Sequence, residues 1–189
     1  MLSRTTVVTV ALLAAACANN ATSVTSLERA ARTGDIATIR ALAAAGADVN
    51  APNPRGTRWT PLLHAIHKDQ RRSVDTLIAL GADVNRASPS GLSPLEMAAG
   101  NGQSPIVKRL LAAGADPRAP GVFTAAVSGG ALSDIDRPLD GTCNPEIVRS
   151  LLERAPDLRL PRSARGHMSY WFARLNQCEA VLSMARFAS

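Results

Sequence analysis

GADVN, at residues 46–50, occurs again at residues 81–85, and an altered copy, GADPR, occupies residues 114–118. The glycines that open the three copies are 35 and 33 residues apart. A phrase that recurs at a fixed period of about 20–50 residues is the signature of a repeat protein, in which similar units stack. The spacing therefore predicts a stack of similar units.

Two short helical segments precede each copy of the phrase. In the second segment of the middle copy, Val74, Leu77 and Ile78 recur at the spacing of one helix face. The first segment begins at Thr60-Pro61, a hydroxyl N-cap followed by the residue that best tolerates the first helical position. The glycine that follows the second segment suits the left-handed position that ends a helix. Each unit is therefore expected to be a helix, a tight break and a second helix.

These residues, in this order and spacing, resemble the ankyrin repeat family over roughly residues 24–160. The resemblance implies an all-α ankyrin-repeat solenoid of helix-turn-helix units with short β-turn fingers. The matching residues are Thr60-Pro61-Leu62, Ala65, Gly81-Ala82-Asp83-Val84-Asn85 and their partners in the third unit. The family's histidine after Thr-Pro-Leu is replaced by Leu63 and Glu96, and His64 stands where a buried leucine is common.

The fourth unit departs from the pattern. Its second helix repeats the apolar spacing at Ile147, but an insertion near residues 129–143 separates it from the first helix. Residues 161–189 are expected to form a C-terminal helical capping repeat that closes the stack. Tyr170 and Trp171 are expected in the core of this cap.

The N-terminal residues have the features of an export signal. Arg4 precedes an apolar stretch that is too short to cross a bilayer and matches the apolar region of a signal peptide. Residues 1–16 are therefore set apart from the fold, and residues 17–23 are expected to be a short linker.

Two readings of the cleavage site remain open. Ala14-Ala15-Ala16-Cys17 resembles a bacterial lipobox, although Ala14 stands where leucine is usual. On this reading Cys17 is lipidated and anchors the protein to the membrane in the periplasm. Ordinary cleavage near Ala16 or Ala18 would instead give a soluble periplasmic or secreted protein.

Export changes how the remaining cysteines are interpreted. Beyond Cys17, the chain has only Cys143 and Cys178. Two thiols in an oxidising compartment suggest a disulfide between them. The alternative is two unpaired, partly buried thiols.

The composition argues against nucleic-acid binding. The net charge is +6 and aromatic residues make up only 3% of the chain. The arginines are spread along the sequence, and no basic run with interleaved aromatic residues occurs. A basic solvated surface explains this charge, so the only expected membrane contact is the lipid on Cys17.

No pattern in the sequence predicts catalysis, a cofactor or a metal site. His64 and His67 have a spacing compatible with metal, but no third ligand is apparent nearby. Asp134, Asp136 and Asp140 lack the glycine and glutamate that a calcium loop of the EF-hand type requires. These aspartates are interpreted as a solvated acidic loop and as a second candidate contact.

The expected partner-binding surface lies at the turn tips and on the exposed side of the first helices, as the ankyrin resemblance implies. The tip after the first GADVN is two residues longer than the next one. It carries Arg55, Arg58 and Trp59, and tryptophan and arginine dominate binding hot spots. The alternative is that Trp59 only covers the edge of the stack. The further candidates are His67, Lys68 and Leu92.

The predicted function is noncatalytic binding of an unidentified protein from the cell envelope by a monomeric chain. One specific alternative is a periplasmic immunity or inhibitor protein directed against a toxin or lipolytic enzyme. Two further alternatives are a structural envelope scaffold and a metal-dependent enzyme.

Overall fold

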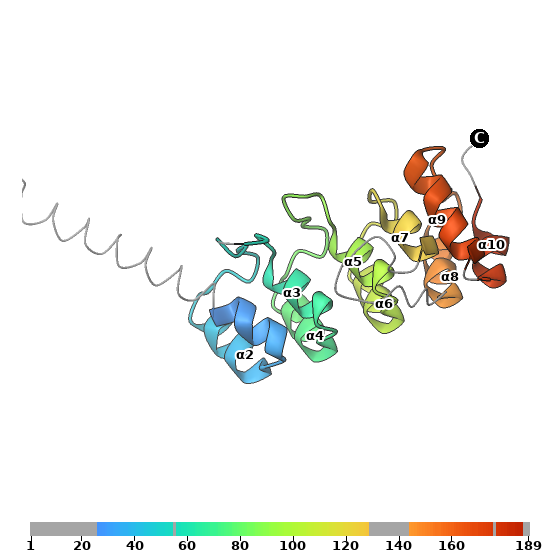
Figure 1. Ribbon diagram of the computed structural model, residues 1–189. Helices are drawn as coiled ribbons and strands as arrows, with labels where there is room; N and C mark the ends of the chain where they lie inside the picture. The colour runs from blue at the N-terminus through green and yellow to red at the C-terminus, as the bar shows by residue number, and fades with distance from the viewer. Residues whose placement is uncertain (1–25, 55, 129–143, 176, 187–189) are drawn as a thin grey trace, which may run out of the picture.

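Helices follow one another along the chain and stack in pairs (Figure 1). The structure, a computed structural model, describes residues 26–54, 56–128, 144–175 and 177–186. Residues 26–33 are helical, and the helices after them are α2 (Ile36–Ala44), α3 (Pro61–His67), α4 (Arg71–Ala79), α5 (Pro94–Gly100), α6 (Ser104–Ala112), α7 (Val122–Ser128), α8 (Pro145–Arg154), α9 (Ala164–Leu175) and α10 (Glu179–Met184).

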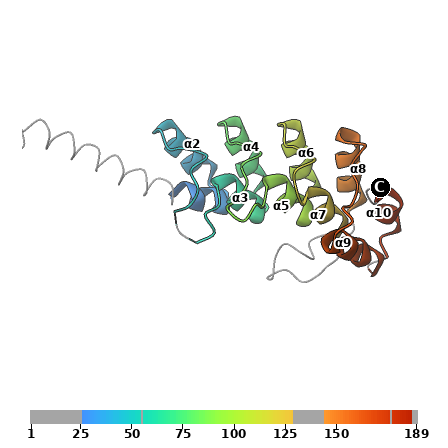
Figure 2. The same ribbon diagram turned by 90° about the horizontal axis from the view of Figure 1, so that it is seen from above.

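The helix pairs define units that we number along the chain. Unit one comprises residues 26–33 and α2, unit two α3 and α4, unit three α5 and α6, unit four α7 and α8, and unit five α9 and α10. The first helices pack side by side in one row and the second helices in another, as Figure 2 shows from above. The connections between units project from one side of the stack (Figure 1).

The predicted helix signals act as expected. The Thr60 and Ser93 hydroxyls accept hydrogen bonds from the backbone N–H groups of Leu63 and Glu96, at 3.3 and 3.1 Å. Both residues precede a proline at the first helical position. The hydroxyls therefore satisfy amides that the helix itself leaves unpaired.

The glycine of each repeated phrase ends a second helix. Gly46, Gly81 and Gly114 have φ values of 87°, 88° and 91°, which residues with a side chain rarely adopt. After α4, the backbone N–H groups of Gly81 and Ala82 donate to the carbonyls of Ile78 and Leu77, at 3.0 and 2.9 Å. This is the geometry of a left-handed helix end, and it turns the chain toward the next unit.

The asparagine of each phrase joins neighbouring units. Asn50 Nδ2 donates to the carbonyl oxygen of Gly81 at 3.1 Å, and Asn50 Oδ1 accepts from the backbone N–H of Asp83 at 2.7 Å. Asn85 makes the same two bonds to Gly114 and Asp116, at 3.1 and 2.9 Å. The phrase therefore ends one helix and also fastens its unit to the next.

Arg118 stands where the third copy would carry its asparagine. Its guanidinium bonds both carboxylate oxygens of Asp157 in unit four, at 3.3 and 2.5 Å. This bond from Arg118 is also the main cause that lowers the pKa of Asp157. An exposed ion pair thus takes the place of the backbone bonds that asparagine makes elsewhere.

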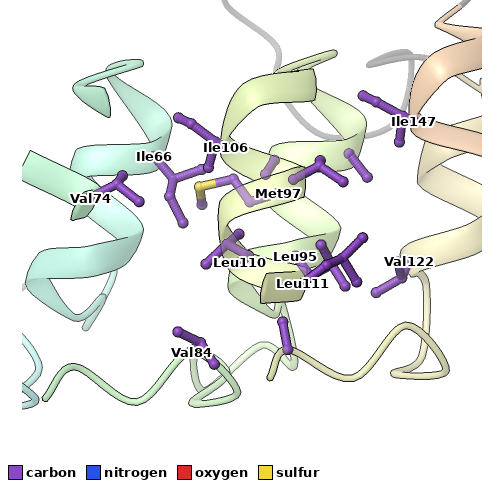
Figure 3. Packing of buried hydrophobic residues seen from close by; sticks show 14 of the residues in the cluster. Ile66, Val74, Val84, Leu95, Met97, Ile106, Leu110, Leu111, Val122 and Ile147 are labelled. Carbon is purple, nitrogen blue, oxygen red and sulfur yellow. The ribbon is translucent and has the colours of Figure 1, made fainter. Parts of the chain in front are cut away.

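The core lies between the two rows of helices and is built from leucine, isoleucine, valine and alanine. Figure 3 shows Ile66 and Val74 of unit two lying toward Met97 and Ile106 of unit three. These four side chains are at most 2% exposed. Because each unit buries its apolar face against its neighbours, the core extends along the whole stack.

The expectation that Trp171 lies in the core of the cap is wrong. Its side chain is 59% exposed, and that of Met168, one turn earlier in α9, is 47% exposed. Tyr170 is partly buried against the core, and Ala173, on the same side of α9, is buried. Neighbouring residues point about 100° apart around a helix, so Trp171 cannot share the direction of Tyr170.

Candidate functional site

The turn between units one and two forms the first finger, residues 51–59. Its base is closed by a hydrogen bond from the backbone N–H of Asn53 to the carbonyl oxygen of Trp59, at 2.9 Å. Arg58 has a φ of 53°, the left-handed region that residues with a side chain seldom occupy. The finger therefore turns sharply just before the tryptophan.

Trp59 lies against helix α3. Its ring centroid is 5.4 Å from that of His64 and 5.2 Å from that of His67, with interplanar angles of 55° and 62°. These are separations and tilts at which aromatic rings attract one another. The indole is half-buried and also packs against the core cluster. Part of its surface therefore stays open while its position is held.

A polar cluster lies beneath the finger and joins units one and two. Asn53 Nδ2 donates to Glu28 Oε2 at 2.5 Å. The other oxygen of Glu28 lies 3.2 Å from His64 Nε2, without the alignment of a hydrogen bond. The side chains of His64 and Glu28 are only 8% and 13% exposed. The finger, the first helix of unit one and α3 therefore meet at one nearly buried polar site.

His64 is neutral at physiological pH. Burial is the largest influence, and together with the positive charges of Arg32, His67 and Lys68 it lowers the pKa of His64 from 6.5 to about 4. The imidazole therefore serves as a packing surface for Trp59 without carrying charge.

The structure gathers most of the predicted partner-binding residues. Arg58, Trp59, His67 and Lys68 all belong to the first finger and α3. Arg58 and Lys68 are exposed and His67 is half-buried. Leu92 occupies the equivalent place to Trp59 on the next turn and packs against the core. Arg55 lies outside the described residues.

The sequence did not predict the roles of Glu28 and Asn53 or the contacts of His64. One signal was available. In the repeat alignment Glu28, Leu63 and Glu96 occupy the same position, where the family carries a histidine. An acidic residue at a buried repeat position needs a partner, and His64 and Asn53 supply it.

The other candidate sites lie only partly within the described residues. Cys17, Cys143 and the aspartates at 134, 136 and 140 lie outside the described residues. Cys178 is buried at the start of α10. Because Cys143 is not described, the pairing of the two cysteines stays a prediction. Within the described ranges, no group of three histidine, cysteine or acidic side chains could hold a metal ion, and no helix is long and apolar enough to cross a membrane.

Paired helices stacked in two rows, joined by projecting turns, define an all-α helical repeat protein. Residues 27–120 match the family model for ankyrin repeats, in three copies, so the chain contains an ankyrin repeat domain. Ankyrin repeats are generally noncatalytic modules that bind other proteins. None of the curated proteins matches the chain.

Proposed function

We propose that this chain binds a protein partner through the first finger and the accessible C-terminal end of helix α3, His67 and Lys68. The observation that carries the proposal is the placement of Trp59. Its indole is held by His64 and His67 and is still partly accessible. A large apolar side chain fixed before binding loses little conformational freedom when a partner covers it, which favours affinity.

The test is capture of a partner from envelope extract by the purified chain. A single stoichiometric partner is expected, and the combined substitution Arg58→Ala and Trp59→Ala should abolish its capture without loss of helicity. The matched control is Arg72→Ala with Leu80→Ala, which removes an exposed arginine and an exposed apolar residue from α4 and its C-cap. If the partner is retained after the finger substitutions, the finger is not the binding surface.

We propose further that the chain is exported and that Cys17 carries a lipid. The apolar stretch that ends in Ala-Ala-Ala-Cys supports this proposal. Palmitate labelling should be found on the protein and should be lost in Cys17→Ser. Unlabelled protein in the soluble periplasmic fraction would favour ordinary cleavage instead.

The predicted disulfide of Cys143 with Cys178 belongs to the same proposal, because it requires an oxidising compartment. Mass spectrometry of the unreduced protein should find the two cysteines linked. Two free thiols would contradict the disulfide and leave the binding surface unaffected.

An alternative, more specific function is inhibition of a toxin or lipolytic enzyme in the periplasm. The signal-like sequence at the N-terminus and the ankyrin repeats together support it. A toxin gene next to this one, whose product harms cells only when this chain is absent, would support the inhibitor. A toxin that stays active when this chain is bound to it would contradict that role.

A further inference from the structure

Two cations, Arg32 and Lys68, lie close enough to His64 that their positive charges help to lower its pKa. Glu28 and His64 approach to 3.2 Å, so the first helices of units one and two are aligned at this level. Arg32 follows Glu28 by one helical turn, and Lys68 follows His64 by one turn. Residues four apart on a helix lie on the same side, so Arg32 and Lys68 extend the surface at which Glu28 and His64 meet. Both side chains are exposed.

Trp59 contacts the same histidine that these cations influence. Its ring lies against His64 and His67, and Arg32 and Lys68 both act on His64. Arg58, the exposed residue before the tryptophan, adds a third cation. We call Arg32, Arg58 and Lys68, together with the indole of Trp59, the cationic front.

The acidic groups around the cationic front already have other partners. Glu28 lies beneath it, bonded by Asn53 and facing His64. Asp35 accepts hydrogen bonds from the backbone N–H and hydroxyl of Thr38, and Asp69 lies 3.6 Å from Arg71. The front therefore presents positive charge around a fixed apolar group.

The positive charge belongs to units one and two. In unit three, Gly100 and Asn101 occupy the positions of His67 and Lys68, and Leu92 replaces Trp59. The first helix of unit three therefore carries no charge at this level. A partner selected by charge would dock on the first two units.

We propose that the partner presents an acidic surface, in which carboxylates surround an apolar side chain that covers Trp59. Arginine binds carboxylates through paired hydrogen bonds, and lysine attracts them as a point charge. Complementary charge also speeds the encounter of two proteins and fixes their orientation. This inference rests on the proposed protein-binding function and specifies the chemistry of the partner.

A charge-reversal pair tests the proposal on the captured partner. The variant with Arg32→Glu and Lys68→Glu is expected to bind at least about tenfold more weakly, and wild-type affinity should fall as salt is added. The matched control is Arg40→Glu with Arg72→Glu, which changes the net charge equally on α2 and α4, in the row of second helices. Equal loss in both variants, or no loss in the first, overturns the acidic partner while binding through Trp59 still supports the protein-binding function.

A defined probe tests the front without any captured partner. In a Trp171→Phe background, fluorescence reports Trp59 alone, because the chain has only these two tryptophans. A short peptide of alternating glutamate and leucine should change this fluorescence, and its lysine–leucine counterpart should not. The change should disappear in the charge-reversed front and persist in the control. Equal responses to the two peptides, or none to the acidic one, overturn the proposal.

Anionic vesicles separate a protein partner from a membrane surface. Vesicles of phosphatidylglycerol and of phosphatidylcholine should bind the front variant and the control alike. If phosphatidylglycerol binding is lost only in the front variant, and the acidic peptide does not bind, the front is a membrane-contacting surface and the acidic protein partner is wrong.

Discussion

The junction between units one and two and the junction between units two and three are alike on one side and different on the other. On the side of the repeated phrase, Asn50 and Asn85 make the same two bonds to the next unit, with lengths that differ by at most 0.2 Å. On the side of the fingers, equivalent positions carry different chemistry. The shared side holds the stack together, so function is to be sought on the side that differs.

The first junction places a polar cluster beneath its finger. Glu28, Asn53 and His64 meet there and support Trp59. Burying such groups costs free energy unless their partners are well placed.

The second junction replaces this cluster with small and apolar residues. Its finger is closed by the same kind of backbone bond, from Ser88 to Leu92 at 2.9 Å, and the Ser88 hydroxyl bonds Leu92 and Ser90 within the finger. Leu63 stands in the place of Glu28 and is fully buried. Because this junction stacks without a polar cluster, stacking alone does not explain the cluster in the first.

The largest expected effect is a pH dependence of the free energy of unfolding that arises from the first junction and not from the second. The pKa of His64 is about 4 in the folded protein and about 6.5 in the unfolded chain, so only the unfolded chain gains this proton between these values. The free energy of unfolding should therefore fall by up to about 3 kcal/mol as pH drops from 6.5 to 4. Urea unfolding of His64→Leu should lose this part of the pH dependence.

The matched control is Met97→Leu, at the equivalent position in unit three, which should keep the wild-type pH dependence. The opposite outcome is a wild-type protein that becomes more stable toward pH 5, with this gain lost in His64→Leu. It would show that an ion pair between protonated His64 and Glu28 stabilises the fold.

The next effect tests whether the two junctions share one mechanism on the side of the repeated phrase. Asn50→Ala and Asn85→Ala each remove two bonds to the following unit and should lower the free energy of unfolding by about 1–2 kcal/mol. The two losses, measured by urea unfolding, should agree within about 0.5 kcal/mol.

Asn101→Ala, at the C-cap of α5, is the control for these substitutions and should change stability by less than about 0.5 kcal/mol. A clear loss for only one of the two phrase asparagines would show that the junctions are unlike on both sides.

The smallest expected change in stability concerns Arg118, which replaces the asparagine of the repeated phrase. Arg118→Ala should lower stability less than Asn85→Ala, because an exposed ion pair contributes little. Its contribution should weaken with added salt. It should also be lost as pH falls through the folded-state pKa of Asp157, which Arg118 lowers.

Arg118→Asn restores the residue that the first two copies carry. Its stability should equal that of the wild type or exceed it, and it should depend less on salt. If Arg118→Asn is as unstable as Arg118→Ala, the backbone of unit four cannot accept the bonds that asparagine makes elsewhere.

The sequence predicted the regular part of the molecule because each signal acts within a few residues. Thr60 and Ser93 cap the helices that follow them, and Gly81 ends the helix before it. The bonds from Asn50 to the next unit were not predicted, although both bonded residues belong to the next copy of the same phrase. The place of the asparagine in the phrase gives no sign of these bonds, and only the stacked neighbour reveals them.

The sequence by itself determined the repeat, the helix ends and the projecting finger that carries Trp59. Only the tertiary structure decided that Glu28 and His64, far apart in the chain, lie 3.2 Å from each other, and that Trp171 faces outward. Local signals depend on backbone geometry over a few residues. Contacts between units depend on how whole helices align when they stack, which no short stretch of sequence contains.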